Sequence, residues 1–317
     1  MNFPRIIFYG TPDFAVTSLK QLVEAGYPVV CVVTAPDKPA GRGLKLKVSP
    51  VKEFAVASGI PVLQPEKLRD PLFLEQIDSF KPDLQIVIAF RMLPREVWSR
   101  PPLGTFNLHA SLLPQYRGAA PIQWAVINGD QQTGVTTFFL NEAIDQGRIL
   151  LFEKVPIGEM ETSGELHDRL METGSNLVLR TVEGIIKGEL SGTGQDTTCA
   201  LKTAPKIQKA DCRINWDQEA GVVFNFIRGL SPHPGAFTEL RGAKGIHTFR
   251  IFRARPVRNE NLMKPGSFMT DGKSFLKVAV RDGYIFIDEL QYAGRKTMIT
   301  ADFLRGYGKI FSETLDI

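Results

Sequence analysis

Cysteine is scarce in this 317-residue sequence, which contains only Cys31, Cys199 and Cys212. No two of them have the close spacing of metal ligands, and three scattered cysteines do not make a disulfide framework. The sequence therefore predicts no metal site and no disulfides, and it favours a reducing compartment.

Long apolar runs are missing as well. The chain starts Met-Asn-Phe-Pro-Arg before a short apolar stretch that is too brief for the core of a signal peptide. No window approaches the roughly 20 apolar residues of a membrane span. We expect a cytoplasmic protein that makes no use of a membrane.

A Gly-rich phosphate cradle is absent from the first strand-to-helix turn, which reads Phe8-Tyr-Gly-Thr-Pro-Asp-Phe. Dinucleotide-binding folds carry a GxGxxG fingerprint at this position. This absence argues against an NAD-dependent oxidoreductase.

Positive charge is concentrated in the last third of the chain. From Ile207 onward there are 17 Lys and Arg against 12 Asp and Glu, whereas the preceding residues have 21 against 22. Such an asymmetry suits a polyanionic partner such as RNA, and a solubilising surface explains it equally well.

The first two hundred residues alternate short apolar runs with amphipathic stretches. Val/Ile-rich strands separated by helices predict a doubly wound, mostly parallel α/β sheet, which is a Rossmann-like domain, here over residues 1–190. The expected strands are 5–9, 29–33, 61–63, 84–90, 105–109, 134–140 and 149–155, and the expected helices are 14–25, 51–58, 73–80 and 164–187.

A Gly/Ser/Thr-rich stretch follows, and we expect residues 191–206 to be a linker. Beyond it, a helix over 219–228 precedes short strands over 249–252, 275–280 and 284–290. These strands predict a second domain over 207–317, a small OB-like β-barrel of the kind that binds nucleic acids.

Two polar residues share one face of the strand 105–109. Side chains alternate along a strand, so Asn107 and His109 project together while Phe106 and Leu108 project into apolar packing. The following Ser-Leu-Leu-Pro ends the strand at the edge where open α/β sheets place their ligands. A candidate site results, although a lone His109 could also be a core histidine satisfied by backbone groups.

The segment Asn107-Leu-His-Ala-Ser-Leu-Leu-Pro-Gln-Tyr-Arg-Gly resembles the signature of the folate-dependent formyltransferases. The stretch from Thr133 to Ile149, with Ile144-Asp-Gln-Gly, resembles the second motif of that family. The resemblance implies a catalytic set of Asn107, His109 and Asp145, although taken alone Asp145 is an ordinary turn residue.

Formyl transfer explains these residue types. An amine attacks the formyl carbon, and the resulting oxyanion needs preorganised donors, which Asn107 and a protonated His109 supply. A carboxylate at Asp145 holds the imidazole charged and accepts the amine proton. Neither a metal nor a covalent enzyme intermediate is needed.

The resemblance further implies a pocket for the donor, 10-formyltetrahydrofolate. We expect this pocket between the end of the strand 84–90 and the turn after His109, because apolar side chains and turn backbone can hold a pterin ring. The expected pocket residues are Phe90, Arg91, Met92, Ser111, Leu112, Leu113 and Pro114.

The formyl acceptor is indicated by an oversized loop after the second strand, Ala35-Pro-Asp-Lys-Pro-Ala-Gly-Arg-Gly-Leu-Lys-Leu-Lys-Val-Ser-Pro. It resembles an insertion loop of tRNA-directed members of the family, and the resemblance implies formylation of methionyl initiator tRNA. We expect the enzyme to be a monomer. The expected tRNA contacts are Lys38, Arg42, Lys45 and Lys47. From composition alone, a solvated loop competes with this interpretation.

Three alternatives remain open. The same chemistry could formylate an amino sugar or another small amine, or hydrolyse formylfolate. An RNA-binding protein could use the α/β domain as a scaffold. The rival enzymes do not explain the basic barrel together with the loop, and an RNA-binding scaffold has no need of Asn107 and His109 on one face.

Overall fold

The computed structural model describes residues 3–40, 45–242, 245–259, 263–308 and 310. The chain divides into two compact units. Unit 1 comprises Met1–Pro121, Thr133–Pro156 and His167–Ala204, and unit 2 comprises Ile122–Gln132, Ile157–Leu166 and Pro205–Ile317.

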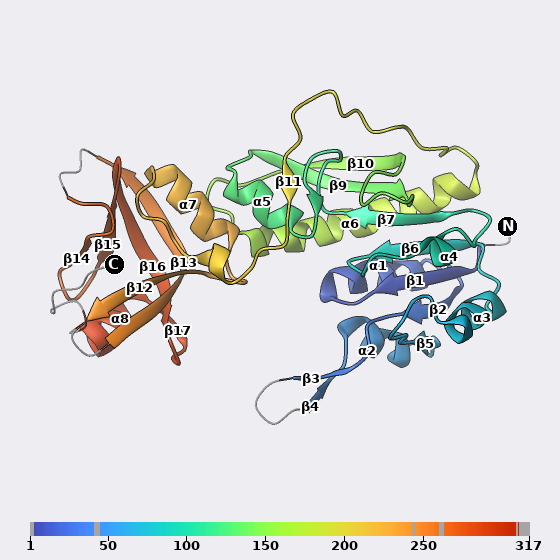
Figure 1. The fold of residues 1–317 in the computed structure, drawn as a ribbon, viewed down its shortest axis with the longest axis horizontal. Helices are drawn as coiled ribbons and strands as arrows, with labels where there is room; N and C mark the ends of the chain where they lie inside the picture. Colours follow the sequence, from blue (N-terminus) through green and yellow to red (C-terminus); the bar gives the residue numbers. More distant parts are fainter. Residues whose placement is uncertain (1–2, 41–44, 243–244, 260–262, 309, 311–317) are drawn as a thin grey trace. The chain divides into compact units, whose positions relative to one another are not determined.

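A seven-stranded sheet with the order β10-β9-β7-β6-β1-β2-β5 organises unit 1 (Figure 1). Strands β7, β6, β1, β2 and β5 are parallel, and β9 is antiparallel to β7. The strands are β1 (Ile6–Gly10), β2 (Val29–Val33), β5 (Val62–Leu63), β6 (Leu84–Ile88), β7 (Thr105–His109), β9 (Gln132–Phe139) and β10 (Ile149–Pro156).

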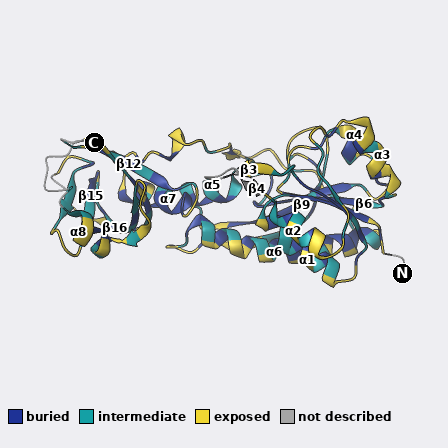
Figure 2. Cartoon of the chain, turned by 90° about the horizontal axis from the view of Figure 1, so that it is seen from below, coloured by how far each residue is buried: buried dark blue, intermediate teal, exposed yellow. Residues whose placement is uncertain are grey.

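Helices pack on this sheet and bury its strands. Every residue of β1 and β6 is buried, as expected for parallel strands covered on both faces. Figure 2 shows dark blue strands beside helices whose outer faces are yellow. Unit 1 contains α1 (Asp13–Glu24), α2 (Pro50–Ala57), α3 (Pro71–Ser79), α4 (Arg95–Trp98) and most of α6 (Ser163–Ile186).

Local sequence explains where two of these helices begin. Ser49 accepts a hydrogen bond from the backbone N–H of Lys52 and caps α2, while Asp70 accepts one from Leu72 and caps α3. Both caps are followed by proline, whose fixed φ suits the first helical position and whose missing N–H is not needed there.

Two short ladders lie outside the main sheet. Strand β3 (Lys38–Ala40) pairs antiparallel with β4 (Lys45–Lys47), and β8 (Arg117–Gly118) pairs in parallel with β11 (Thr203–Ala204). The second ladder joins the segment after β7 to the end of the stretch that follows α6.

Unit 2 is built on an antiparallel sheet with the order β12-β13-β16-β15-β14, and β17 pairs with β16. It forms a half-barrel with its own apolar core, to which Phe249, Ile251 and Phe303 contribute. Its elements are α5 (Pro121–Ile127), η1 (Ala210–Cys212), α7 (Ala220–Gly229), β12 (Ala236–Gly242), β13 (Gly245–Arg258), β14 (Phe268–Thr270), β15 (Leu276–Val280), β16 (Gly283–Tyr292), β17 (Thr297–Ile299) and α8 (Thr300–Tyr307).

The expected fold class is confirmed: a mixed, mostly parallel Rossmann-like unit accompanies a small antiparallel barrel-like unit. None of the helices in the described part of the chain combines the length and the hydropathy needed to cross a membrane.

Candidate active site

Strand β7 delivers Asn107 and His109 to one face at its carboxyl end. Asn107 lies beside Val87 of β6, and His109 lies beside Thr136 of β9. Leu108 points to the opposite face, where its methyl group lies against Gly174 of α6. Asn107 and His109 therefore share one face of the sheet while Leu108 lies on the other, as predicted.

The imidazole of His109 is nearly buried and is contacted on two sides. Its Nε2 lies 2.8 Å from the carbonyl oxygen of Tyr116, which can only accept, so Nε2 donates. Its Nδ1 lies 4.0 Å from Oδ2 of Asp145, and the two side chains are 7% and 14% exposed. The structure thus brings Asp145 to the side of His109 that is not fixed by Tyr116.

Asp145 adopts a backbone conformation that is unusual for a residue with a side chain, with φ of +53°. Its Oδ2 accepts a hydrogen bond of 2.9 Å from the backbone N–H of Gly118, and its carbonyl oxygen accepts one of 2.9 Å from Nε2 of Gln195. The residue is therefore held at both its side chain and its backbone.

The Asn107 side chain is half-buried beside this pair. Across the described residues, its amide makes no hydrogen bond to another protein group. Its two N–H donors are consequently available to a ligand at the carboxyl edge of the sheet.

The turn after β7 is fixed by internal hydrogen bonds. The hydroxyl of Ser111 donates to the carbonyl oxygen of Gln115 at 2.6 Å, and the hydroxyl of Thr136 donates to the carbonyl oxygen of Ser111 at 2.6 Å. Leu113 is buried, while Leu112 and Pro114 are half-buried. Ser111 therefore shapes the turn from within.

The segment after β6 carries the other three predicted folate contacts. Phe90 packs on Tyr9 with ring centroids 5.7 Å apart, whereas Met92 is 71% exposed. The Arg91 guanidinium donates to the carbonyl oxygens of Pro65 and Glu66, and burial lowers its pKa. Arg91 thus ties the segment to the connection between β5 and α3.

The predicted tRNA loop leaves the same edge of the sheet, after β2. Lys38 and Lys47 are exposed and face each other across the β3–β4 ladder, and Lys45 lies on β4. Arg42 lies outside the described residues. At the base of the loop, Asp37 accepts hydrogen bonds from Lys52 and Gln64.

Three residues near Asp145 were not singled out by the sequence. Gly118 supplies the N–H that Asp145 accepts, Tyr116 supplies the carbonyl that fixes His109, and Gln195 contacts the Asp145 backbone. Tyr116 and Gly118 lie inside the recognised motif, but Gln195 lies in a Gly/Ser/Thr-rich stretch that gave no signal.

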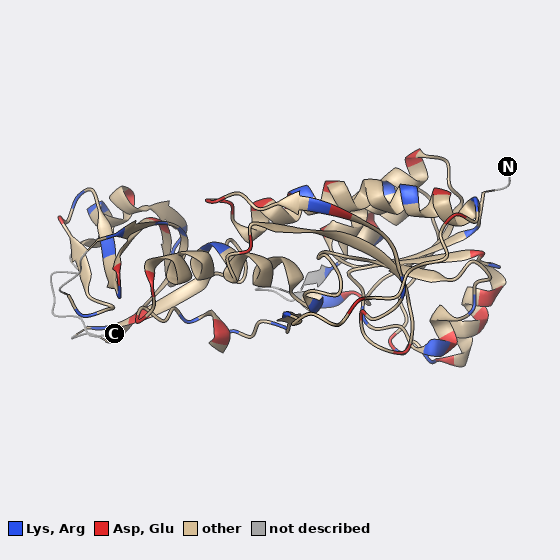
Figure 3. Ribbon diagram, turned by 90° about the horizontal axis from the view of Figure 1, so that it is seen from above, with Lys and Arg blue, Asp and Glu red and all other residues tan. Residues whose placement is uncertain are grey.

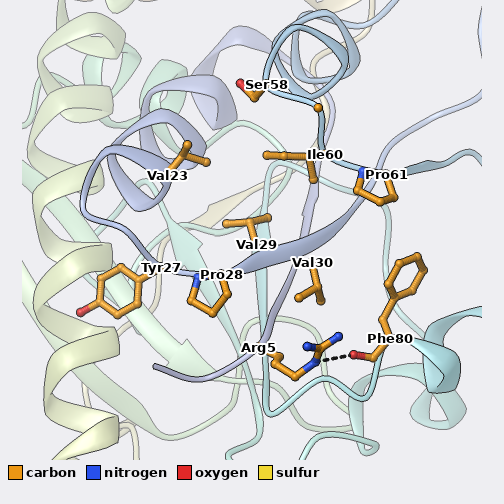
Figure 4. A pocket seen from close by; sticks show the side chains of 11 residues that line it. Arg5, Val23, Tyr27, Pro28, Val29, Val30, Ser58, Ile60, Pro61 and Phe80 are labelled. Carbon is orange, nitrogen blue, oxygen red and sulfur yellow. Dashed lines mark hydrogen bonds between the residues drawn. The ribbon is translucent and has the colours of Figure 1, made fainter. Parts of the chain in front are cut away.

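Two measurable hollows of unit 1 lie elsewhere. One of about 510 Å³ lies at the amino ends of β1, β2 and β5, between residues such as Arg5, Val29 and Phe80 (Figure 4). The other, of about 400 Å³, lies beside Trp98 and Phe139. Within the described part of the chain, no three His, Cys, Asp or Glu side chains are grouped to hold a metal ion.

The basic residues of unit 2 are mixed with acidic ones (Figure 3). Arg255 makes a two-pronged contact with Asp288, and Arg253 pairs with Glu165 and Glu289. The excess positive charge of this part of the sequence is thus partly compensated where the structure describes it.

Two protein families match the sequence. Residues 4–182 match the family described as formyl transferase, and residues 206–308 match the one described as formyl transferase, C-terminal domain.

Curated relatives match over almost their whole length. The chain is 51% identical over 307 residues to a methionyl-tRNA formyltransferase of Bacteroides fragilis, covering 96% of this chain and 95% of the relative. It is 53% identical over 309 residues to one of Phocaeicola vulgatus (96% and 95%), and 46% identical over 302 residues to one of Flavobacterium johnsoniae (95% and 96%).

Solved structures share the fold at low sequence identity. HypX from Aquifex aeolicus in complex with tetrahydrofolic acid has a TM-score of 0.65 at 20% identity, with coverage of 96% of this chain and 47% of HypX, so the chain spans about half of HypX. An N-formyltransferase from Helicobacter canadensis in complex with folinic acid and dTDP-3-aminofucose has a TM-score of 0.64 at 18% identity, with coverage of 90% and 98%.

Proposed function

The chain belongs to the formyl transferase family, and on that premise we propose that it transfers a formyl group from 10-formyltetrahydrofolate to the amino group of methionyl initiator tRNA. Relatives that bear the name of this activity match nearly the whole chain. The observation that carries the chemistry is the grouping of His109, Asp145 and the unengaged amide of Asn107 at one sheet edge.

The reaction forms a bond from the amino nitrogen to the formyl carbon and breaks the bond from that carbon to N10 of the folate. A tetrahedral intermediate with a negative oxygen lies between the two steps. We assign Asn107 and His109 as donors to that oxygen. Such donors are worth about 100- to 1000-fold in rate when they are already in place.

Proton movement completes the balance, because the attacking amine loses one proton and N10 gains one as it leaves. Nε2 of His109 donates to the Tyr116 carbonyl, so Nδ1 is the ring nitrogen left to form a hydrogen bond with the substrate. The Asp145 carboxylate stands on the Nδ1 side. In this proposal Asp145 takes the amine proton, directly or through water, and holds the charge of the ring when Nδ1 is protonated.

The folate is proposed to lie between the segment after β6 and the turn after β7. Phe90, Met92, Leu112, Leu113 and Pro114 supply apolar surface there, and the backbone of the turn supplies hydrogen-bonding groups for the pterin. Arg91 and Ser111 belong to the same pocket, and their contacts with Glu66 and Gln115 support a role in shaping its walls.

The tRNA is proposed to contact Lys38, Arg42, Lys45 and Lys47, together with a C-terminal domain over residues 207–317. The catalytic domain is then residues 1–190, with residues 191–206 between them. The two family matches, at 4–182 and 206–308, support this division. We further propose that the enzyme acts as a monomer in the cytoplasm, where charged initiator tRNA is used.

The test is a substrate panel. Purified protein is incubated with 10-formyltetrahydrofolate and either methionyl initiator tRNA, methionyl elongator tRNA, free methionine or a nucleotide-linked amino sugar. We expect formylmethionine on the initiator tRNA and little product elsewhere. Formylation of the amino sugar alone, or release of formate without any transfer, would refute the proposal.

A further inference from the structure

The connecting segment is fastened across the candidate active site. We refer to residues 191–204, which belong to unit 1, as the strap. It bonds both to the turn after β7 and to the loop between β9 and β10. Thr193 and Ile149 exchange two backbone hydrogen bonds of 2.8 Å. The Tyr116 N–H donates to the Lys202 carbonyl oxygen at 2.7 Å, and the N–H groups of Ala119 and Ala120 donate to the Ala204 carbonyl oxygen at 2.7 and 3.2 Å.

Gln195 uses its whole amide within this arrangement. Its Nε2 donates to the carbonyl oxygens of Asp145 at 2.9 Å and Gly147 at 2.8 Å. Its Oε1 accepts from Nε and Nη2 of Arg117 at 3.1 and 2.5 Å. One half-buried side chain therefore joins the loop that carries Asp145 to the turn that carries Gly118.

Asp145 needs such a support. A φ of +53° is costly for a residue with a side chain, and a backbone of this kind persists where its surroundings determine it. The nearby Gly147 packs closely against the Phe139 backbone, since an added Cβ would lie 1.5 Å from the carbonyl oxygen of Phe139. Among the described residues, only Gln195 donates a hydrogen bond to the Asp145 carbonyl oxygen.

We propose that Gln195 is a positioning residue that sets the Asp145 carboxylate against His109. The same Oδ2 accepts from Gly118 and faces Nδ1 of His109. Because Gln195 ties the two loops that meet at this oxygen, its loss lets the carboxylate move relative to the imidazole. The inference rests on the proposed function, since it assigns Asp145 a part in formyl transfer.

The main test compares Gln195→Leu with wild type in the formylation of methionyl initiator tRNA. We expect kcat to fall about 10- to 100-fold, as displacements of about 1 Å in a catalytic group do. KM for folate and for tRNA should stay within about threefold, because Gln195 contacts protein groups and no substrate is assigned to it. Asp196→Ala is the matched control, since this exposed neighbour in the strap bonds to Thr198, and its kcat should be unchanged.

A double-mutant cycle separates positioning from general damage. If Gln195 acts through Asp145, the double variant Gln195→Leu with Asp145→Asn should have a kcat no more than about twofold below that of Asp145→Asn alone. Full multiplication of the two losses would show that Gln195 acts elsewhere and would overturn the proposal.

A second variant covers the risk of misfolding. Gln195→Glu keeps an oxygen for Arg117 but replaces the donor to the two carbonyls, so it should lose kcat while retaining the attachment of the strap. Thermal unfolding of each variant is measured in parallel. Two results would refute the positioning role of Gln195 while leaving the proposed function intact. In one, both variants are folded and keep kcat within twofold of an active wild type; in the other, neither variant folds. An inactive wild type would instead overturn the proposed function and the inference with it.

Discussion

The two edges of the unit 1 sheet differ in kind. At the amino ends of the strands, the hollow of about 510 Å³ is lined mainly by apolar residues, and Arg5 at its wall donates to the Phe80 carbonyl at 2.8 Å. At the carboxyl ends, the Asn107 amide has no protein partner among the residues that the structure describes, and His109 faces a carboxylate. The Arg5 guanidinium in the wall of this hollow is thus bonded to a protein carbonyl, whereas the carboxyl edge presents Asn107, whose amide has no protein partner among the described residues.

Cavity volume therefore does not locate a reaction by itself. The carboxyl edge gathers groups from β7, from the turn after it and from the β9–β10 loop because parallel strands end there together. The amino edge is formed by the residues that lead into the strands, such as Pro28 before β2 and Pro61 before β5. Paired substitutions, one at each edge, test whether catalysis depends on the carboxyl edge alone.

The largest effect is expected for the two proposed oxyanion donors. Asn107→Ala and His109→Ala should each lower kcat about 100- to 1000-fold, because each removes a preorganised donor. Ser58→Ala, in the wall of the amino-edge hollow, is the matched control and should leave kcat within twofold. Steady-state formylation assays measure kcat for these variants and for the control. Near-normal turnover in either carboxyl-edge variant would remove the basis of the site assignment.

Two glycines with positive φ provide the next contrast. A Cβ at Gly118, where φ is +127°, would lie 2.4 Å from the Ala204 carbonyl oxygen, whereas at Gly59, where φ is +69°, it would meet nothing within 4 Å. Gly118→Ala should destabilise the fold by about 1–3 kcal/mol and lower kcat of the folded fraction by displacing the donor to Asp145. Gly59→Ala should cost about 1 kcal/mol and leave kcat unchanged. Urea unfolding measures the loss of stability, and formylation assays measure kcat. Equal losses of stability and of kcat at Gly118 and Gly59 would contradict this prediction.

A smaller effect is expected for the lysines of the β3–β4 ladder. Combining Lys38→Gln with Lys47→Gln should raise KM for tRNA several-fold, and should reduce the slope of log KM against log salt by about one for each lost phosphate contact. Lys81→Gln, just before β6 at the amino edge, should do neither. An unchanged salt slope in the double variant would place the tRNA contacts elsewhere.

The smallest effect concerns the pH dependence at the base of the same loop. Hydrogen bonds from Lys52 and Gln64 lower the pKa of the Asp37 carboxyl below its ordinary value of 3.8. A carboxyl with a lowered pKa stabilises the folded state above its unfolded pKa, and this stabilisation is lost as pH falls through the folded value. The advantage of wild type over Asp37→Asn in urea unfolding should therefore be present at pH 7 and shrink below about pH 4. A constant difference down to pH 3 would contradict it.

Much of the fold could be predicted because buried parallel strands are continuous apolar runs. The predicted ranges 29–33 and 105–109 are those of β2 and β7. Strand β6 ends at Ile88, short of the predicted Phe90, because Ala89 turns the chain with φ of +47°. Strand β13 extends well beyond the predicted 249–252, since its outer residues are polar and leave no continuous apolar signal.

The site could be predicted only in part. Alternation along one strand was enough to bring Asn107 and His109 together, whereas Asp145 was joined to them by family resemblance, because sequence spacing does not show which loops meet. The two-residue ladder of β8 with β11 and the contacts of Gln195 depend on a polar segment folding back over the site. Such contacts leave no periodicity in the sequence.

The most direct measurement is the position of a bound formylfolate. Crystals soaked with 5-formyltetrahydrofolate, a stable analogue of the donor, would show which edge of the sheet receives it. We expect density between the segment after β6 and the turn after β7, with the pterin and formyl end near Asn107 and His109. Density confined to the hollow between Val29 and Phe80, with the carboxyl edge empty, would contradict it.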